Sequence, residues 1–228
     1  MNRENFEKII GYTFKDKSLL RTALTHSSCC RERKNCYSVN NERLEFLGDA
    51  FFDAVVSAEL YKKMGKVDEG VLTKTRAQVV CESSLASAGK KLNLGEYLYM
   101  GRGEEAIGGR NRKSNIADAM EAIIGAIFLD GGYEAAAAFI SNQFKSTMED
   151  AINGKLFTDF KTRIQEEIQK KKDGSTLKYV LDRTSGPDHN KTFYVHIECD
   201  GKLLGRGSGS SKKQAEQQAA KAALERGV

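Results

Sequence analysis

The chain has 228 residues, a formal net charge of +5 at pH 7, 40% hydrophobic residues and 29% charged residues. It is too long for one small module and too short for three domains, and its composition is that of an ordinary soluble globular protein. The mild positive charge permits a polyanionic partner without requiring one.

The first ten residues, MNRENFEKII, contain an acid early and no long apolar run. We therefore expect neither a signal peptide nor a membrane anchor, and we predict a cytoplasmic protein. The cysteines are odd in number and lack paired zinc spacing with a nearby histidine, which predicts reduced thiols. They are Cys29, Cys30, Cys36, Cys81 and Cys199.

Two short helices are expected at the start of the chain. The first ends at Gly11, and the second is capped by Asp16 and ends near His26. His26 has no acidic partner adjacent in sequence, so a structural role is favoured over that of a general base. Residues 27–40 are polar and show no periodicity, which predicts a surface loop.

The next stretch, NERLEFLGDA at residues 41–50, begins a helix that continues to about residue 61, with apolar residues at spacings of three and four. Glu42, Glu45 and Asp49 share this spacing and would lie on one side of the helix. Carboxylates this close repel one another and lose hydration beside apolar neighbours, which favours a divalent cation.

Asp68 is expected to cap a helix over residues 69–87. Glu69, in its first turn, has two interpretations that remain open: interaction with the helix dipole or an outer contact near a metal. The glycine-rich residues 94–115 contain neither GxGxxG nor GK[ST] and follow no strand, so no nucleotide-binding loop is predicted. The basic residues near the end of this segment are predicted to steer a polyanion; they are Arg110, Arg112 and Lys113.

A second apolar helix, residues 115–129, carries Asp118 and Glu121 three positions apart. If it packs against the helix of Glu45 and Asp49, four acids converge on one pocket. Oxygen-only ligands suit Mg²⁺ or Mn²⁺ and argue against zinc. Gly48 and Gly125 cost roughly 1 kcal/mol each in helix propensity, which close helix approach would offset. A closing helix over residues 133–152 completes an all-helical first domain.

The pattern changes after this domain. We predict domain boundaries at 1–153 for the first domain, 154–158 for a linker and 159–228 for the second domain. A helix at 161–172 is followed by alternating runs at 177–184, 192–199 and 202–207 and by a helix at 212–226. Asp200 and Gly201 form a strong two-residue hairpin turn. The predicted order is α-β-β-β-α.

Three segments carry a resemblance to a known family. NERLEFLGDA and the later segment DAMEAIIGAIFLDGG resemble the signature and the second acidic helix of the ribonuclease III family, and FKDKSLLRTALTHSS resembles its opening helices. The resemblance implies a homodimeric endonuclease that cuts double-stranded RNA with Mg²⁺ and leaves 5′-phosphate and 3′-hydroxyl ends. It places the catalytic, metal-binding acids at Glu45, Asp49, Asp118 and Glu121, accessory acids at Glu42 and Glu69, and a dimer contact at Phe46.

The second domain resembles the double-stranded-RNA-binding domain. KTRIQEEI resembles its first helix and implies contacts of Gln165 and Glu166 with 2′-hydroxyls, and GPDHNKTF implies that His189 reaches a minor groove. Ser211 is expected to cap the last helix, whose first residues Lys212 and Lys213 meet phosphate. Such a domain reads the shape of about 16 base pairs. Many stand-alone members carry a basic residue where this chain has Glu216.

Our hypothesis is an endoribonuclease in which the four acids hold two Mg²⁺ ions about 4 Å apart for in-line hydrolysis, processing ribosomal RNA precursors and messenger RNA, with Mn²⁺ able to substitute. One pocket cuts one strand, so duplex cleavage suggests a two-fold dimer. No membrane or nucleotide cofactor is expected. Two alternatives stay open: a non-cleaving duplex-RNA-binding regulator, and a metal-dependent hydrolase of small phosphorylated metabolites. A C-terminal domain that binds only protein is the alternative for the tail.

Overall fold

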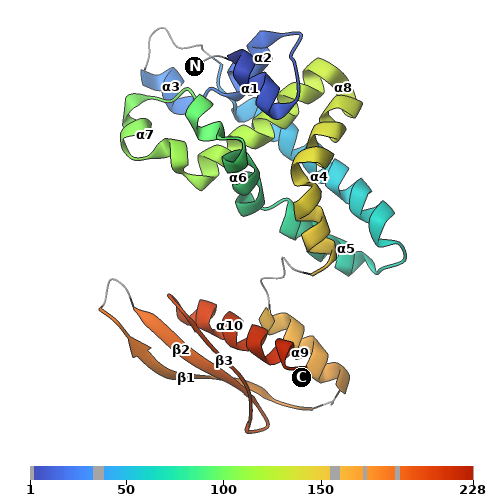
Figure 1. Ribbon diagram of the computed structural model, residues 1–228, viewed down its shortest axis with the longest axis vertical. Coiled ribbons are helices and arrows are strands. Elements are labelled where there is room, and N and C mark those ends of the chain that lie inside the picture. Colours follow the sequence, from blue (N-terminus) through green and yellow to red (C-terminus); the bar gives the residue numbers. More distant parts are fainter. Residues whose placement is uncertain (1–2, 33–38, 155–159, 172–173, 188–190, 228) are drawn as a thin grey trace. The chain divides into compact units, whose positions relative to one another are not determined.

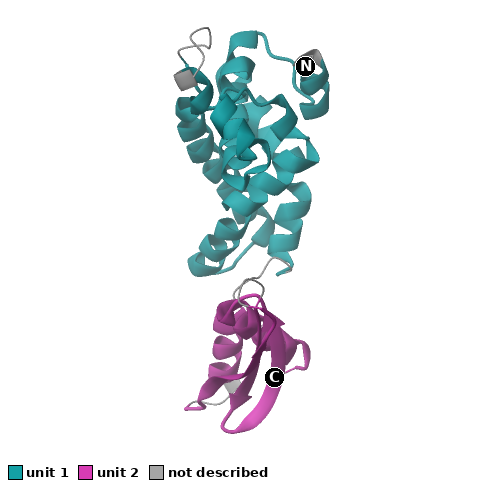
Figure 2. Ribbon diagram, turned by 90° about the vertical axis from the view of Figure 1, so that its left-hand side faces the viewer, with its two compact units in different colours: residues 1–156 teal, residues 157–228 magenta. Residues whose placement is uncertain are grey.

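The computed structural model describes residues 3–32, 39–154, 160–171, 174–187 and 191–227 and divides the chain into two compact units, Met1–Leu156 and Phe157–Val228 (Figure 2). Each unit has its own buried apolar core. The exact linker residues 154–158 stay a prediction.

The first unit is all-helical over the residues described, as predicted (Figure 1). Besides its α-helices, the described part of this unit contains two short 3-10 helices, η1 and η2, on either side of α7. In chain order the elements are α1 (Arg3–Ile10), α2 (Lys17–Ala23), α3 (Ser27–Glu32), α4 (Glu42–Met64), α5 (Glu69–Val79), α6 (Glu82–Lys91), η1 (Leu94–Tyr97), α7 (Arg102–Ala106), η2 (Gly109–Asn111) and α8 (Lys113–Ile152).

The contact between α4 and α8 is the centre of this unit. Gly48 on α4 lies directly against the backbone carbonyl of Glu121 on α8, and Gly125 on α8 lies against the carbonyl of Leu44 on α4. A Cβ atom at either glycine would overlap that carbonyl, so only glycine permits this helix separation. Farther along the same pair of helices, the rings of Phe52 and Phe144 pack with centroids 4.5 Å apart.

Helix α8 is long and apolar enough to cross a membrane by length and composition alone. Its apolar side chains nevertheless form the core of the unit, with Met120, Ile123 and Ile127 fully buried. Gly132, at φ 77°, interrupts the helical backbone and separates the acidic part of α8 from its closing part. This is the helix end predicted there, and α8 is a core helix.

Two predicted elements of the first unit differ from the structure. Residues 27–32 form α3 rather than loop, because Cys29 is buried and Ser28 Oγ accepts a hydrogen bond from the backbone N–H of Gly101. The helix predicted over 69–87 breaks at Cys81, whose backbone is extended. The change of direction buries both Val79 and Leu85, and no glycine or proline marks it in the sequence.

Two smaller predictions also need correction. Asp68 stands at the N-cap position of α5, but its side chain makes no capping hydrogen bond. The prediction that all five cysteines are reduced is wrong for Cys29, which is disulfide-bonded. Cys30, Cys81 and Cys199 are not in disulfide bonds.

The second unit has the predicted α-β-β-β-α order. It comprises α9 (Phe160–Lys171), β1 (Leu177–Ser185), β2 (Thr192–Cys199), β3 (Lys202–Gly209) and α10 (Lys212–Glu225), with the strands in an antiparallel sheet of order β1-β2-β3. Asp200 and Gly201 both have positive φ, 49° and 80°, as the two-residue turn between β2 and β3 requires. Both helices pack on one face of the sheet, around Ile164, Val195 and Ile197.

Helix α10 lies unusually close to β3. A Cβ atom at Gly205 or Gly207 would meet the backbone of Ala219, so these glycines allow direct helix-to-strand contact. At its start, Ser211 Oγ accepts a hydrogen bond from the N–H of Gln214 at 3.2 Å, which confirms the predicted cap. The first turn of α10, with Lys212 and Lys213, is thereby held in one position relative to the sheet.

The glycine contact between α4 and α8 can be tested by substitution. We expect Gly48→Ala to lower the free energy of unfolding by about 1–3 kcal/mol, because the added methyl overlaps a backbone carbonyl and the helices must separate. Gly70→Ala on α5 is the matched control, because nothing lies within 4 Å of its Cβ position. It should be neutral or stabilising by up to about 1 kcal/mol. Urea denaturation of both variants measures this, and equal stabilities would contradict the close contact.

Candidate active site

Three carboxylates meet where α4 and α8 are closest. Oxygen atoms of Glu45, Asp118 and Glu121 all lie within 4.8 Å of one another, and all three side chains are half-buried. Glu45 precedes Gly48 by three residues, whereas Glu121 is the residue whose carbonyl Gly48 contacts. The close helix contact therefore holds like charges together.

The electrostatics of this group are unfavourable in the absence of a cation. Burial raises the pKa of Glu121 to about 8, reinforced by the charges of Asp49 and Glu45. Burial also raises the pKa of Glu45, with further increases from Asp118, Glu42 and Asp49. The pKa of Asp118 is raised mainly by burial. Each carboxylate thus resists ionisation, first because burial removes its hydration and then because neighbouring carboxylates repel its charge.

These residues fit a divalent metal. The donors of this cluster are carboxylate oxygens only, as a hard cation such as Mg²⁺ prefers. Their separations suit shared ligation, and their repulsion and partial desolvation are what a bound cation would offset.

The remaining predicted acids lie outside this cluster of three. Asp49 is exposed but acts electrostatically on Glu121 and Glu45. Glu42 is exposed in the first turn of α4 and acts on Glu45. Glu69 is exposed in the first turn of α5, where its carboxylate accepts a hydrogen bond from Thr73 Oγ1 at 2.7 Å. Both interpretations of Glu69, interaction with the helix dipole and an outer contact near a metal, stay predictions.

Three residues near the cluster were not assigned to it from the sequence. Asp53 contributes to the raised pKa of Glu121, and Glu82 contributes to that of Asp118. Asp53 follows Asp49 by four residues on α4, so helical spacing alone could have identified it. Glu82 could not be found this way, because it lies on α6.

His26 is the third such residue. Its positive charge, when present, lowers the pKa of Asp118. The N–H of Ser28 donates to His26 Nδ1 at 3.2 Å, and Ser28 Oγ lies 2.8 Å from the same nitrogen. Since Nδ1 accepts a hydrogen bond, the neutral ring carries its proton on Nε2. The side chain is therefore locally anchored, as the structural interpretation predicted, yet it lies within electrostatic reach of the site.

Two of the basic residues predicted to steer a polyanion have internal partners. Arg110 donates to Glu105 at 2.7 Å and to the carbonyls of Gly95 and Leu98 at 2.9 Å, so it holds together the segment before α8. Arg112 forms an ion pair with Glu104 at 2.7 Å. The Arg110 guanidinium is therefore used inside the fold, and steering of a polyanion by these residues stays a prediction.

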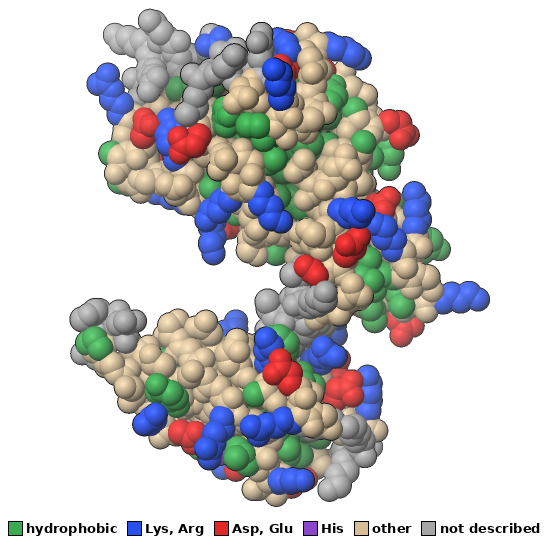
Figure 3. Space-filling model, viewed as in Figure 1, with side chains coloured by type: hydrophobic (Ala, Val, Ile, Leu, Met, Phe, Trp, Pro, Cys, Tyr) green, Lys and Arg blue, Asp and Glu red, His purple; other side chains and the backbone are tan. Residues whose placement is uncertain are grey.

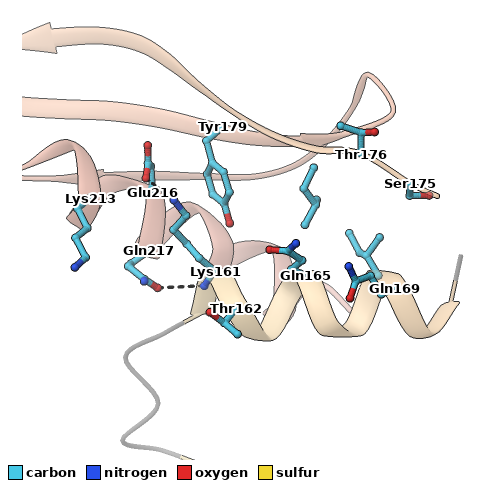
Figure 4. Close-up of a pocket in the computed structure, with 12 residues that line it drawn as sticks. Lys161, Thr162, Gln165, Gln169, Ser175, Thr176, Tyr179, Lys213, Glu216 and Gln217 are labelled. Atoms are coloured by element: carbon cyan, nitrogen blue, oxygen red, sulfur yellow. Dashed lines mark hydrogen bonds and ion pairs between the residues drawn. The ribbon is translucent and has the colours of Figure 1, made fainter. Parts of the chain in front are cut away.

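The predicted duplex contacts of the second unit are partly brought together. A hollow of about 780 Å³ between α9, α10 and the start of β1 is lined by Gln165, Lys213 and Glu216, among others (Figure 4). Lys212 is exposed beside Lys213. Glu166 does not line this hollow, and His189 lies outside the described residues. On the face of this unit visible in Figure 3, acidic side chains lie among the basic ones.

Comparison with family models matches residues 16–148 to the description "Ribonuclease-III-like" and residues 160–226 to "Double-stranded RNA binding motif". The chain belongs to the ribonuclease III family. Ribonuclease 3 of Caldanaerobacter subterraneus is 49% identical over 96% of this chain and 95% of its own length. Ribonuclease 3 of Clostridium perfringens is 46% identical over 99% of this chain and 94% of its own length.

A solved structure agrees with this family assignment. The nuclease domain of ribonuclease III from Campylobacter jejuni has a TM-score of 0.59 and 46% sequence identity over 64% of this chain and 97% of that domain. It is described for structural flexibility in the region involved in its dimer formation. The predicted fold class, an all-helical nuclease domain of this family followed by a double-stranded-RNA-binding domain, is confirmed.

The raised pKa of Glu121 predicts a pH-dependent stability in metal-free buffer. Between about pH 4.5 and 8 the unfolded chain loses the Glu121 proton, whereas the folded protein keeps it. The folded state then binds more protons, so the free energy of unfolding falls as pH rises through this window. Glu121→Gln cannot lose this proton, so its stability relative to the unmodified protein should increase from pH 4.5 to 8 and then level off. Urea denaturation with EDTA measures the difference, and a pH-independent difference would contradict the shift.

Proposed function

We propose that this protein is an endoribonuclease that hydrolyses phosphodiester bonds in double-stranded RNA with divalent metal ions held by Glu45, Asp49, Asp118 and Glu121. The observation that carries the proposal is the half-buried carboxylate cluster at the α4–α8 contact. It occurs in a chain of the ribonuclease III family whose second unit matches a double-stranded-RNA-binding motif.

The carboxylates have distinct roles in this proposal. Glu45, Asp118 and Glu121 are close enough to share a metal, and exposed Asp49 adds negative charge at the rim of the cluster. When bound, Mg²⁺ ions, or Mn²⁺ in their place, supply the Lewis acid that activates water and stabilises the leaving 3′ oxygen in a two-metal reaction. The carboxylates hold the metal ions in position, and no side chain acts as the nucleophile. The products carry 5′-phosphate and 3′-hydroxyl ends.

The second unit supplies duplex recognition. Exposed Lys212 and Lys213 lie in the first turn of α10, where unpaired backbone N–H groups already favour phosphate. Gln165 lies across the hollow, on α9. This arrangement reads the shape and 2′-hydroxyls of RNA, so DNA should bind less well. Ribosomal RNA precursors and structured messenger RNA in the cytoplasm are the proposed substrates.

A homodimer is also part of the proposal. Phe46, the residue after Glu45, is 80% exposed on α4. It borders an apolar hollow of about 690 Å³ whose lining includes Leu19, Leu47 and Leu129. An exposed aromatic side chain beside an apolar hollow on the same surface suits a two-fold contact, in which each Phe46 enters the hollow of the other chain. Such a dimer brings two carboxylate clusters to one duplex, one for each strand.

Glu121→Gln tests the catalytic assignment. We expect the variant to lose cleavage by at least about 100-fold, because the site loses one metal-binding charge, and to bind duplex RNA as before. Labelled duplex RNA with Mg²⁺ measures cleavage, and binding is measured in EDTA. Glu59→Gln makes the same charge change on α4, where Glu59 pairs with Lys63 at 3.2 Å, and this control should cleave normally.

Full cleavage by Glu121→Gln would refute Glu121 as a ligand. If the unmodified protein binds duplex RNA without cutting it, the non-cleaving regulator is the correct function instead. If it cleaves small phosphorylated metabolites and ignores RNA, the metabolite hydrolase is correct.

Phe46→Ala tests the dimer. Removing a central aromatic anchor should raise the dimer dissociation constant at least tenfold, equivalent to about 1.4 kcal/mol. Sedimentation velocity across a concentration series measures the shift. Tyr61→Ala is the matched control, because Tyr61 lies on the same helix, is 71% exposed and does not line the hollow. An unchanged dissociation constant for Phe46→Ala would place the dimer contact elsewhere.

A further inference from the structure

Lys161, in the first turn of α9, forms an ion pair inside the second unit. Its Nζ lies 2.7 Å from Glu216 Oε2 on α10 and 4.4 Å from the centre of the Tyr179 ring on β1. The backbone N–H of Lys161 donates to Gln217 Oε1 at 3.2 Å (Figure 4). Two consecutive residues of α10, Glu216 and Gln217, therefore both contact Lys161 and attach the start of α9 to α10.

The position of this ion pair matters because of what surrounds it. Lys161 and Glu216 line the same hollow as Gln165 and Lys213, two of the residues assigned to the duplex (Figure 4). A carboxylate thus stands on a surface that must approach a polyanion. The pair places one anion on this surface and leaves one cation fewer available to phosphate.

Partial burial makes the pair more than an exposed surface contact. The Glu216 side chain is only 14% exposed, and that of Lys161 is 35% exposed. Reduced solvent screening strengthens an ion pair at this distance relative to one in open water. An RNA phosphate that approaches Lys161 must compete with Glu216 for the ammonium group and is repelled by the same carboxylate.

We propose that Glu216 is an internal counter-ion that withholds Lys161 from RNA phosphate and so limits the affinity of this protein for duplex RNA. The inference rests on the proposed function, because it assumes that α9 and the start of α10 face the duplex. Glu216 is thereby a residue that determines affinity. The affinity of the second unit for duplex RNA is lower than it would be if all its basic residues were available to phosphate.

Glu216→Gln in the full chain tests this. The isosteric change removes the carboxylate charge and leaves Lys161 available to phosphate. We expect duplex affinity to rise by about 3- to 10-fold at low salt, and the slope of log Kobs against log salt to steepen by about one unit, as for one added phosphate contact. Binding is measured by fluorescence anisotropy in EDTA, with a duplex of about 30 base pairs that exceeds the ~16 base-pair footprint. Glu216→Ala should change affinity and slope in the same direction.

Two further variants separate this mechanism from a general charge effect. Lys161→Met combined with Glu216→Gln replaces the ion pair by an uncharged pair at the same net charge, and should restore the original affinity and slope. Glu225→Gln adds the same unit of positive charge on the same helix and releases Lys221, which lies 3.9 Å from Glu225. Because neither residue lines the hollow, its effect should be below twofold.

The outcomes distinguish the inference from the function on which it rests. Unchanged affinity and slope in Glu216→Gln, or equal gains in Glu216→Gln and Glu225→Gln, would overturn the counter-ion role. Failure of the unmodified protein to bind duplex RNA would overturn duplex recognition itself. So would an unchanged salt slope after combined Lys212→Ala and Lys213→Ala substitution, which should make the slope shallower.

Discussion

The backbone contact between α4 and α8 at Gly48 and Gly125 is the constraint on which the catalytic unit depends. It lets the helices approach until Glu45, Asp118 and Glu121 lie close together, although their negative charges repel one another. The repulsion is tolerated because the same helices bury a large apolar core around Phe52, Met120 and Phe144. Hydrophobic burial thus holds a charged site that would not assemble by itself.

Close packing at glycines also positions side chains in the second unit. Gly205 and Gly207 allow α10 to lie directly on β3, and Ser211 sets where the helix begins. Lys212 and Lys213 then occupy a defined position relative to α9, which carries Gln165. In both units a close glycine contact in the core determines where functional side chains lie on the surface.

The two proposed functional surfaces treat charge in opposite ways. In the catalytic unit, several carboxylates lie close together and few positive charges offset them. The raised pKa of Glu121 therefore indicates a site that favours a cation. In the second unit, part of the cationic charge is already neutralised, because Glu216 takes up Lys161. In the proposed function, the first surface attracts metal ions strongly, whereas the second attracts phosphate less strongly than its basic residues would allow.

The sequence by itself determined the local features of this protein, because caps, turns and periodicity depend on neighbouring residues. Gly11, Asp16, Gly132 and the Asp200–Gly201 turn all stand where the pattern predicted, as do the three strands. The four acids were named from their spacing on two apolar helices and from a family signature.

Only the tertiary structure decided which distant side chains meet. It brought Glu82 and His26 into electrostatic reach of Asp118, divided the predicted helix at Cys81, and directed Arg110 inward. It also joined Lys161 to Glu216, which are 55 residues apart in sequence. These contacts are set by how the cores pack, and packing between remote segments leaves no periodic trace in the chain.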